Sequence, residues 1–146
     1  MLNIDENLLT KIPQDIAKEV MGGRTDENKT TSSQIRKFYD DFLVLQKKMH
    51  DVSFTEERFK NEILPLIKFA KAKMAYSVGK GVLPKIFMDK MVPYIEAIQT
   101  RKCFDNFILF YQAVIGYAKF AEFESKSQNQ SGGRGNGGYN NNGRRN

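Results

Sequence analysis

Apolar residues recur every three or four positions along most of the chain, which is the spacing that gathers side chains on one face of an α-helix. The pattern predicts helices over residues 6–21, 32–49, 53–79, 83–98 and 104–121. Pro13 interrupts the first of these stripes early. No stretch alternates apolar and polar residues for long enough to indicate a β-strand. We therefore expect an all-α protein, a compact bundle of about five helices.

Capping and turn residues indicate where the helices begin and end. Residues 31–34 (TSSQ) and 53–56 (SFTE) match the capping box, in which side chains satisfy free backbone N–H groups at a helix start. Gly79 is placed to end the third helix, because glycine readily adopts the left-handed conformation found at helix termini. Pro65 and Pro93 lie inside apolar stripes, so we expect the first to kink or split its helix and the second to interrupt the next.

Two polar segments divide the chain. The stretch GGRTDENKT has no apolar period and predicts a linker, so residues 1–30 form a short helix and linker before a helical bundle of residues 31–124. From residue 125 onward the chain consists mainly of Gly, Asn, Ser and Gln, with scattered arginines, one lysine and one tyrosine. Such a composition lacks the apolar surface that offsets the entropy cost of ordering, so we expect residues 125–146 to form a disordered basic tail.

The chain is basic, and its charge is unevenly distributed. It has 23 lysines and arginines against 17 acidic residues, a net charge of +6. Residues 58–102 alone contain ten bases and three acids, a local net charge of +7. A basic face attracts polyanions, although a solubilising face without a ligand explains the composition equally well. No apolar run reaches the ~20 residues of a membrane span, and the N-terminus does not resemble a signal peptide, so we expect a cytoplasmic protein.

Reactive side chains are scarce. Cys103 is the only cysteine and His50 the only histidine, which excludes an intrachain disulfide and a cysteine-based zinc site. We expect Cys103 to be a buried apolar residue and His50 to lie on the surface near a helix end. The motifs of nucleotide-binding loops, zinc proteases and serine hydrolases are missing from the sequence. We therefore expect no catalytic residue, no metal site and no cofactor.

Lysines offer a candidate surface for phosphate groups. Lys68, Lys71 and Lys73 lie on one predicted helix, and Lys80 and Lys85 follow across a glycine turn. Lys68 and Lys71 share a helix face, whereas Lys73 lies to the side. Lysines on a helix face beside a turn can follow a sugar–phosphate backbone, which makes Lys68, Lys71, Lys80 and Lys85 candidates for RNA contact.

Three further features point to nucleic acid, each with an ordinary alternative. Tyr76 lies among these lysines, where its ring could stack on an unpaired base or could belong to the core with its hydroxyl at the rim. Arg36 and Lys37 lie in the first turns of a predicted helix, whose free N–H groups favour phosphate. An ion pair from Arg36 to Asp40 explains the arginine equally well. Arg134, in the segment GGRG, could contact RNA or belong to an inert tail.

The last predicted helix is apolar on more than one side. Tyr117, Phe120 and Phe123 lie near its end and off its main stripe. A helix with two apolar sides is either central in a bundle or lies at a partner interface. These three residues are therefore candidate interface residues. An alternative function follows, in which the chain is a helical protein–protein adaptor that self-associates and makes no direct nucleic-acid contact.

Three short segments together resemble a known family. They are residues 33–38 (SQIRKF), 75–80 (AYSVGK) and 117–120 (YAKF). In this order and spacing the chain resembles the small subunit of type III-A (Csm) CRISPR effector complexes, over about residues 30–124. The resemblance implies a five-helix bundle, stacked in several copies along a filament that acts in antiviral defence. It also implies a subunit without a nuclease centre that contacts target RNA without reading its sequence.

The resemblance also implies site residues and partners. By matching position, Arg36, Lys80 and Lys119 become the leading RNA-contact candidates, with Tyr76 beside them. Lys80 stands where many relatives are expected to carry arginine, and lysine lacks the bidentate geometry that arginine offers to phosphate. The implied partners are single-stranded target RNA, the guide-RNA ribonucleoprotein and other Csm subunits, in the cytoplasm of a prokaryote.

Overall fold

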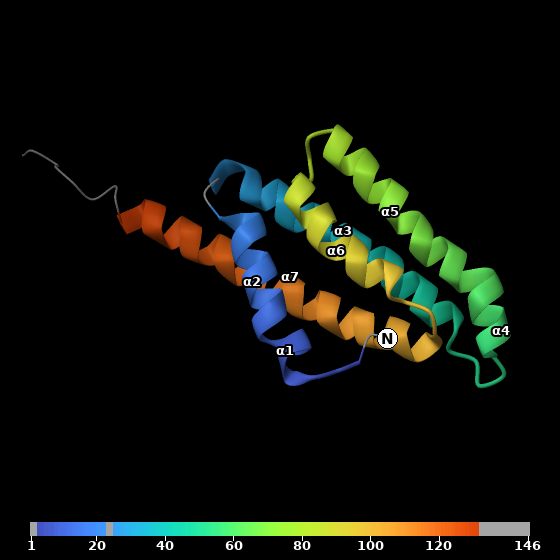
Figure 1. The fold of residues 1–146 in the computed structure, drawn as a ribbon. Helices are drawn as coiled ribbons and strands as arrows, with labels where there is room; N and C mark the ends of the chain where they lie inside the picture. Colours follow the sequence, from blue (N-terminus) through green and yellow to red (C-terminus); the bar gives the residue numbers. More distant parts are fainter. Residues whose placement is uncertain (1–2, 23–24, 132–146) are drawn as a thin grey trace, which may run out of the picture.

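The helical stripes predicted from the sequence form a bundle in the computed structural model, which describes residues 3–22 and 25–131. The elements in order are α1 (Glu6–Leu9), α2 (Lys11–Met21), α3 (Thr25–Lys48), α4 (Glu56–Arg58), the π-helix η1 (Phe59–Ile63), α5 (Leu64–Gly79), α6 (Lys85–Glu96) and α7 (Arg101–Ser131). Because α4, η1 and α5 run on from one another, the bundle has five long elements (Figure 1). The described residues contain no strand, and the all-α prediction is confirmed.

The N-terminal segment is divided at Thr10. The Asp5 side chain caps α1 by accepting a hydrogen bond from the Leu8 N–H at 2.7 Å. Thr10 then has φ −126° and ψ −77°, outside the helical region, and α2 begins at the next residue. Pro13, which was predicted to interrupt the helix, lies instead in the first turn of α2. Proline is tolerated there because the first N–H groups of a helix have no partner within the helix.

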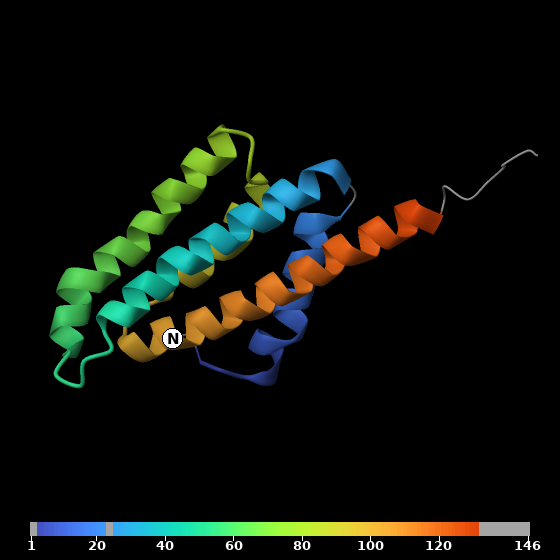
Figure 2. The same cartoon turned by 180° about the vertical axis from the view of Figure 1, so that it is seen from behind.

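Helix α2 supplies part of the core. Its apolar side, Ile16, Ala17, Val20 and Met21, is buried. The helix crosses α7 and also contacts α6 (Figures 1 and 2). Helix α2, which precedes the polar segment of residues 22–30, is therefore packed on the rest of the bundle.

Helix α3 begins at Thr25, earlier than the start near residue 32 that the capping box predicted. Residues 25–30 are helical and not a linker. Thr31 is buried within the helix at 4% exposure, so it cannot serve as the first residue of an exposed helix end. A capping box is a local signal, and packing of α3 along α7 overrides it here.

The proline in the third stripe divides its helix, as predicted. The Thr55 side chain, and not Ser53, caps α4 by accepting from the Arg58 N–H at 3.1 Å. The π-helix η1 follows, and the Leu64 N–H donates to the carbonyl of Phe59, five residues earlier. Pro65 then lies in the first turn of α5, where its missing N–H costs no helical hydrogen bond. The shift into π-helical register thus positions the proline at a helix start.

The turn from α5 to α6 differs from the prediction in one detail. Helix α5 ends at Gly79, but the left-handed residue is Gly81, with φ +78°. Pro84 is the N-cap of α6. The prediction that Pro93 interrupts this helix is wrong, because α6 continues through Pro93 to Glu96. Both Pro93 and Asp89, four residues before it, are exposed, so water can reach the carbonyl that lacks a helical donor.

The core is rich in aromatic side chains between α3 and α7, which run side by side (Figures 1 and 2). The Phe42 ring meets those of Phe107 at 5.1 Å, Tyr111 at 5.7 Å and Phe104 at 6.2 Å, all edge to face. The Tyr111 hydroxyl donates to the carbonyl of Ile35 at 2.7 Å. These contacts fix how α3 lies along α7.

Helix α7 extends further than predicted. The disordered tail was expected from residue 125, but the helix continues to Ser131. The Ser125 hydroxyl donates to the carbonyl of Ala121 at 3.1 Å. Once a helix is nucleated, each added residue gains a hydrogen bond, so polar residues can extend a packed helix beyond its apolar stripe. Residues 132–146 of the predicted tail lie outside the described residues. No helix in the described ranges has the length and hydropathy needed to span a membrane.

Candidate nucleic-acid interface

The predicted basic residues of α5 lie on two different sides of the helix. Lys68 and Lys71 face α6, whereas Lys73 and Tyr76 face α3. The separation follows from the helical period, because residues three or four apart share a side and residues five apart do not. The two sides of α5 therefore have different surroundings.

The side facing α6 holds its lysines in internal contacts. The half-buried Lys68 ammonium donates to the carbonyls of Ile95 at 2.7 Å and Glu96 at 2.9 Å, which caps the end of α6. Desolvation, and then the neighbouring Lys71 charge, lowers the pKa of Lys68, while the Glu96 carboxylate opposes the shift. Lys71 pairs with the Glu96 carboxylate at 3.4 Å. These contacts tie α5 to α6, and Lys68 in particular has little freedom to meet a phosphate.

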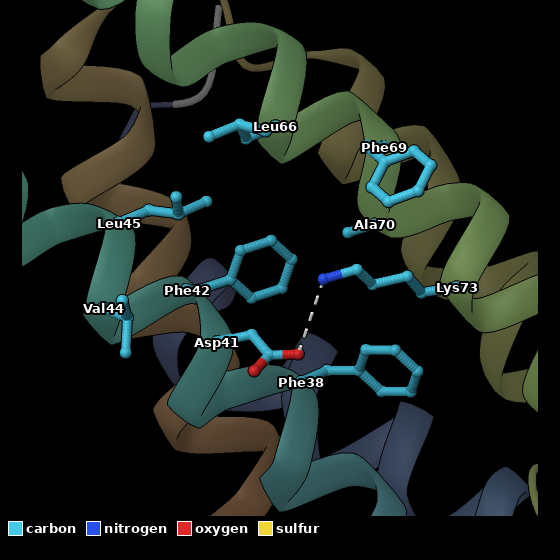
Figure 3. Close-up of a pocket in the computed structure, with 9 residues that line it drawn as sticks. All are labelled: Phe38, Asp41, Phe42, Val44, Leu45, Leu66, Phe69, Ala70 and Lys73. Carbon is cyan, nitrogen blue, oxygen red and sulfur yellow. Dashed lines mark ion pairs between the residues drawn. The ribbon is translucent and has the colours of Figure 1, made fainter.

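The side facing α3 borders an open groove. Phe38 and Asp41 of α3 face Phe69 and Lys73 of α5 across it, and Lys73 reaches towards Asp41 with Nζ 4.0 Å from the carboxylate (Figure 3). Eight residues line the wider part, of about 520 Å³: Lys37, Phe38, Asp41, Phe69, Ala72, Lys73, Tyr76 and Ser77. A narrower part of about 200 Å³ continues between Leu45 and Leu66. The groove thus combines exposed rings with lysines.

Tyr76 is on the surface and not in the core. Its side chain is 68% exposed, which removes the alternative that it belongs to the core. The Lys80 ammonium lies 5.6 Å from the centre of its ring. Two turns before Lys80, Lys73 lies at the same distance from the ring of Phe69, which is 55% exposed. Phe69 was not among the predicted site residues, although its spacing from Lys73, Tyr76 and Lys80 was visible in the sequence.

Arg36 and Lys37 lie near the middle of α3, since the helix begins at Thr25. The argument that placed them at a helix N-terminus is therefore wrong. Both are exposed, and Lys37 lines the groove. Within the described part of the chain Arg36 forms no ion pair with Asp40, which removes that alternative for the arginine.

The remaining basic candidates do not share the groove. Lys85 pairs with Asp89 on α6 at 3.0 Å. Lys119 pairs at 3.5 Å with Glu122, whose side chain is buried. Lys119 lies on the C-terminal half of α7, which extends away from α5 in both views (Figures 1 and 2). The structure therefore brings Lys37 and Tyr76 together in the groove with the additional Lys73, and it places Lys80 beside the Tyr76 ring. Lys85 and Lys119 lie elsewhere.

The candidate interface residues form an apolar patch on α7. Phe120 and Phe123 are 56% and 64% exposed, and Tyr117 is half-buried. Ala113 and Gly116 join Tyr117 and Phe120 around a shallow apolar hollow of about 310 Å³. Exposed aromatic patches of this kind often mark contacts with partners.

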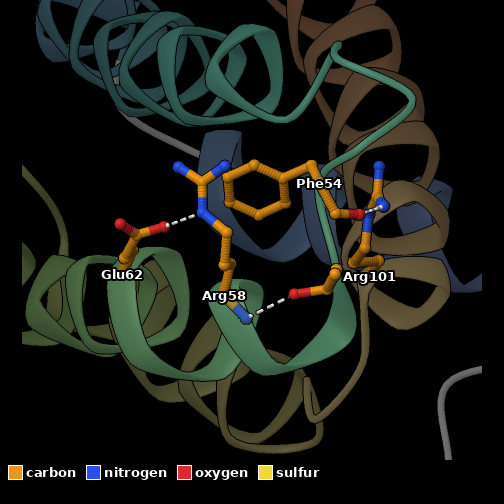
Figure 4. A network of polar contacts seen from close by, with 5 residues as sticks. Phe54, Arg58, Glu62 and Arg101 are labelled. Carbon is orange, nitrogen blue, oxygen red and sulfur yellow. Dashed lines mark hydrogen bonds and ion pairs between the residues drawn. The ribbon is translucent and has the colours of Figure 1, made fainter.

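Two arginines counted in the basic stretch 58–102 make internal contacts. Arg101 at the start of α7 donates to the carbonyl of Phe54 and, at 3.0 Å, to that of Met49. The Arg58 guanidinium stands 4.5 Å from the centre of the Phe54 ring and pairs with Glu62 at 2.8 Å (Figure 4). The Arg101 guanidinium also faces the ring, at 5.5 Å. This network fastens the loop after α3 to α7.

The single cysteine and the single histidine lie where the sequence predicted them. Cys103 is buried and His50 is exposed just after α3, as predicted for both. In residues 3–22 and 25–131 no group of three His, Cys, Asp or Glu side chains is placed to hold a metal ion. The groove and the α7 patch are the features with chemistry suited to binding.

Comparison with known proteins shows the family to which this chain belongs. Neither the curated proteins nor the solved structures contain a match to this chain. The model of the family described as Csm2 Type III-A matches residues 5–124, which covers every element from α1 to α6 and most of α7. The match includes the three segments on which the resemblance was based. The chain therefore belongs to the Csm2 family, the small subunits of type III-A CRISPR complexes.

Proposed function

We propose that this chain is a non-catalytic small subunit of a type III-A ribonucleoprotein in the cytoplasm of a prokaryote, where it binds target RNA through the backbone phosphates. Family membership supports the place in the complex. The observation that carries RNA binding is the groove between α3 and α5, which Lys37 and Lys73 line together with the exposed rings of Phe69 and Tyr76. Lys80 adds a further positive charge 5.6 Å from the Tyr76 ring. Contacts to phosphate position a strand and carry no sequence information, so binding is indifferent to sequence.

Charge substitution in the full chain tests this function. Replacing Lys37, Lys73 and Lys80 by glutamine should weaken binding of single-stranded RNA at low salt, equally for strands of different sequence. Because each lost phosphate contact lowers the slope of log affinity against log salt by about 0.7, the triple variant should lose roughly 2 from that slope. Fluorescence anisotropy titrations at several salt concentrations measure both quantities.

The matched control removes the same charge elsewhere. Lys11 and Lys18 on α2 and Lys60 on η1 are exposed and lie outside the groove. Their replacement by glutamine should leave the salt slope close to that of the unaltered chain. Equal losses in both triple variants would mean that net charge, and not the groove, attracts RNA.

The apolar patch on α7 supports a second contact, with another protein chain. Phe120 and Phe123 are exposed on one helix beside an apolar hollow. We assign to this patch the scaffolding contact with a second copy of the chain. Phe120→Ser with Phe123→Ser should abolish self-association in sedimentation velocity while RNA affinity at low salt persists. A chain that self-associates but binds no RNA would instead be the adaptor without nucleic-acid contact.

A further inference from the structure

We infer that one edge of α5 is a base-stacking strip, made of Phe69, Lys73, Tyr76 and Lys80, in which each ring holds an unpaired base and each lysine a neighbouring phosphate. The inference rests on the proposed function and deepens it. Phosphate contact alone needs only cations, whereas this strip adds a site for the bases themselves.

Exposure of the two rings is the first observation. Phe69 and Tyr76 are more than half exposed, although the same helix buries Ile67, Ala70 and Met74 in the core. Neither ring contributes to the packing of α5 on its neighbours to any large extent. Flat apolar surface next to cations is the chemistry on which nucleobases stack. A strand of RNA matches this alternation of rings and positive charges, because it alternates flat bases with phosphates.

Spacing along the helix is the second observation. The four residues of the strip are separated by four, three and four positions, which places them along one side of α5. At 1.5 Å per residue the two rings are about 10 Å apart along the axis. This is about three times the 3.4 Å step between stacked bases in one strand. The two rings therefore serve different bases of an unstacked strand.

Pairing of each ring with a lysine is the third observation. Lys73 and Lys80 each stand 5.6 Å from the centre of a ring, so a base on that ring brings its phosphate close to an ammonium group. A single ammonium group covers at most one face of the Tyr76 ring, which leaves the other face to a base. Lys37 on the opposite wall adds a third positive charge. Asp41 offsets part of the charge of Lys73 through their 4.0 Å contact.

The strip favours single strands over duplexes. In a duplex the bases are stacked on one another and paired, so their faces cannot reach the rings without disrupting the helix. Every base has a flat face, and stacking on an aromatic ring therefore tolerates any sequence. The strip is thus compatible with sequence-indifferent binding and adds a requirement that the strand be unpaired.

RNA lacking its bases separates stacking from phosphate contact. The full chain is titrated with a single-stranded oligouridylate and with an abasic strand of equal length, which keeps every phosphate. Each of the two rings holds one base, so the unaltered chain should prefer the base-containing strand at least tenfold. Phe69→Ala with Tyr76→Ala should lower affinity for that strand to the abasic level and leave abasic binding unchanged. Tyr76→Phe, in the background of native Phe69, should retain the preference.

Leu109→Ala is the matched control, because Leu109 is an exposed apolar residue on α7 that lines neither part of the groove. It should keep the full preference for bases. Quenching of 2-aminopurine in the bound strand by the unaltered chain, and its loss in Tyr76→Ser, gives a second readout that does not depend on the double variant folding. Equal affinity for both strands, with no quenching, would overturn the stacking strip while phosphate binding stands. Failure to bind either strand at low salt would overturn the proposed function itself.

Discussion

Tyr111 lies among the aromatic contacts between α3 and α7. Its ring stacks on Tyr39 at 5.9 Å and meets Phe42 and Phe87 edge to face. Its hydroxyl is buried and donates to the carbonyl of Ile35. Burial, and secondarily the Asp41 carboxylate, raises the pKa of Tyr111 well above its usual value. The residue therefore links α3 to α7 through both its ring and its hydroxyl.

Replacing Tyr111 by Phe should lower the free energy of unfolding by about 1 kcal/mol, the net value of one buried hydrogen bond. The raised pKa means that the unfolded chain loses this proton first as pH rises. The stability it gives is complete below the usual tyrosine pKa of about 10 and is lost as pH rises from there towards the folded pKa. Urea unfolding at several pH values should show a shallower alkaline loss in Tyr111→Phe. Tyr39→Phe, which keeps its stacked ring, should show the alkaline loss of the native chain.

Asp41 is the acidic residue that lines the proposed RNA groove. Its carboxylate repels phosphate and lies 4.0 Å from the Lys73 ammonium, and both side chains are half-exposed. Asp41→Asn should therefore raise RNA affinity about twofold to fivefold, in the range of 0.2–1 kcal/mol expected for one exposed charge pair. The gain should shrink as salt rises, because exposed charges are screened. Asp40→Asn removes the same charge outside the groove; an equal gain there would show that the location of Asp41 is irrelevant.

At the scale of elements, the long apolar stripes predicted the bundle, but the helix ends were predicted less well. The period is a property of many residues together, so one exception does not erase it. A helix end depends on a few residues whose local preference competes with packing. Thr31 is a residue type that favours the N-cap of a helix, and yet it is buried inside α3, because the helix begins earlier, at Thr25, and packs along α7. Pro93 is tolerated within α6 because the affected turn is exposed to water.

Prediction of the candidate site from the sequence was limited in the same way. The sequence placed Lys68 and Lys80 in one group of lysines that could contact the phosphates of RNA. Their surroundings differ, because the carbonyls at the end of α6 hold the Lys68 ammonium, and these come from residues distant in sequence. Tyr76 could be assigned to core or surface only once the position of α3 relative to α5 was known. Charge and aromatic content could thus be predicted from the sequence, and the orientation of each side chain could not.

The turn between α5 and α6 gives a prediction for two glycines. Gly81 has φ +78°, which an L side chain adopts only with strain, whereas Gly79 ends α5 and has open space where a Cβ would stand. Gly81→Ala should lower the free energy of unfolding by about 1–2 kcal/mol. Gly79→Ala should raise it by about 0.4–1 kcal/mol by restricting the unfolded chain. Thermal unfolding of the two variants checks the opposite signs; a loss at Gly79 would locate the critical backbone conformation there instead.

At the scale of the whole molecule, the core is one unit to which distant segments contribute. Helix α2 buries Ile16, Val20 and Met21, and it packs on α7 and α6. The opposite end of the bundle is fastened by Arg101, which holds the carbonyls of Met49 and Phe54. Because α7 takes part in both contacts, loss of either contact should destabilise the whole helix.

Deletion of residues 1–22 tests whether the core is one unit. Burial of a large apolar side chain contributes about 1.5–3 kcal/mol, so loss of three or more removes an amount comparable to the roughly 5–15 kcal/mol that stabilises an entire domain. The shortened chain should lose its cooperative thermal transition in calorimetry and its near-ultraviolet circular dichroism. Gln14→Ala with Lys18→Ala alters only exposed positions of α2 and should melt like the native chain. A cooperative transition in the shortened chain at the native temperature would mean that α3 to α7 form a complete core, with α2 an accessory on its surface.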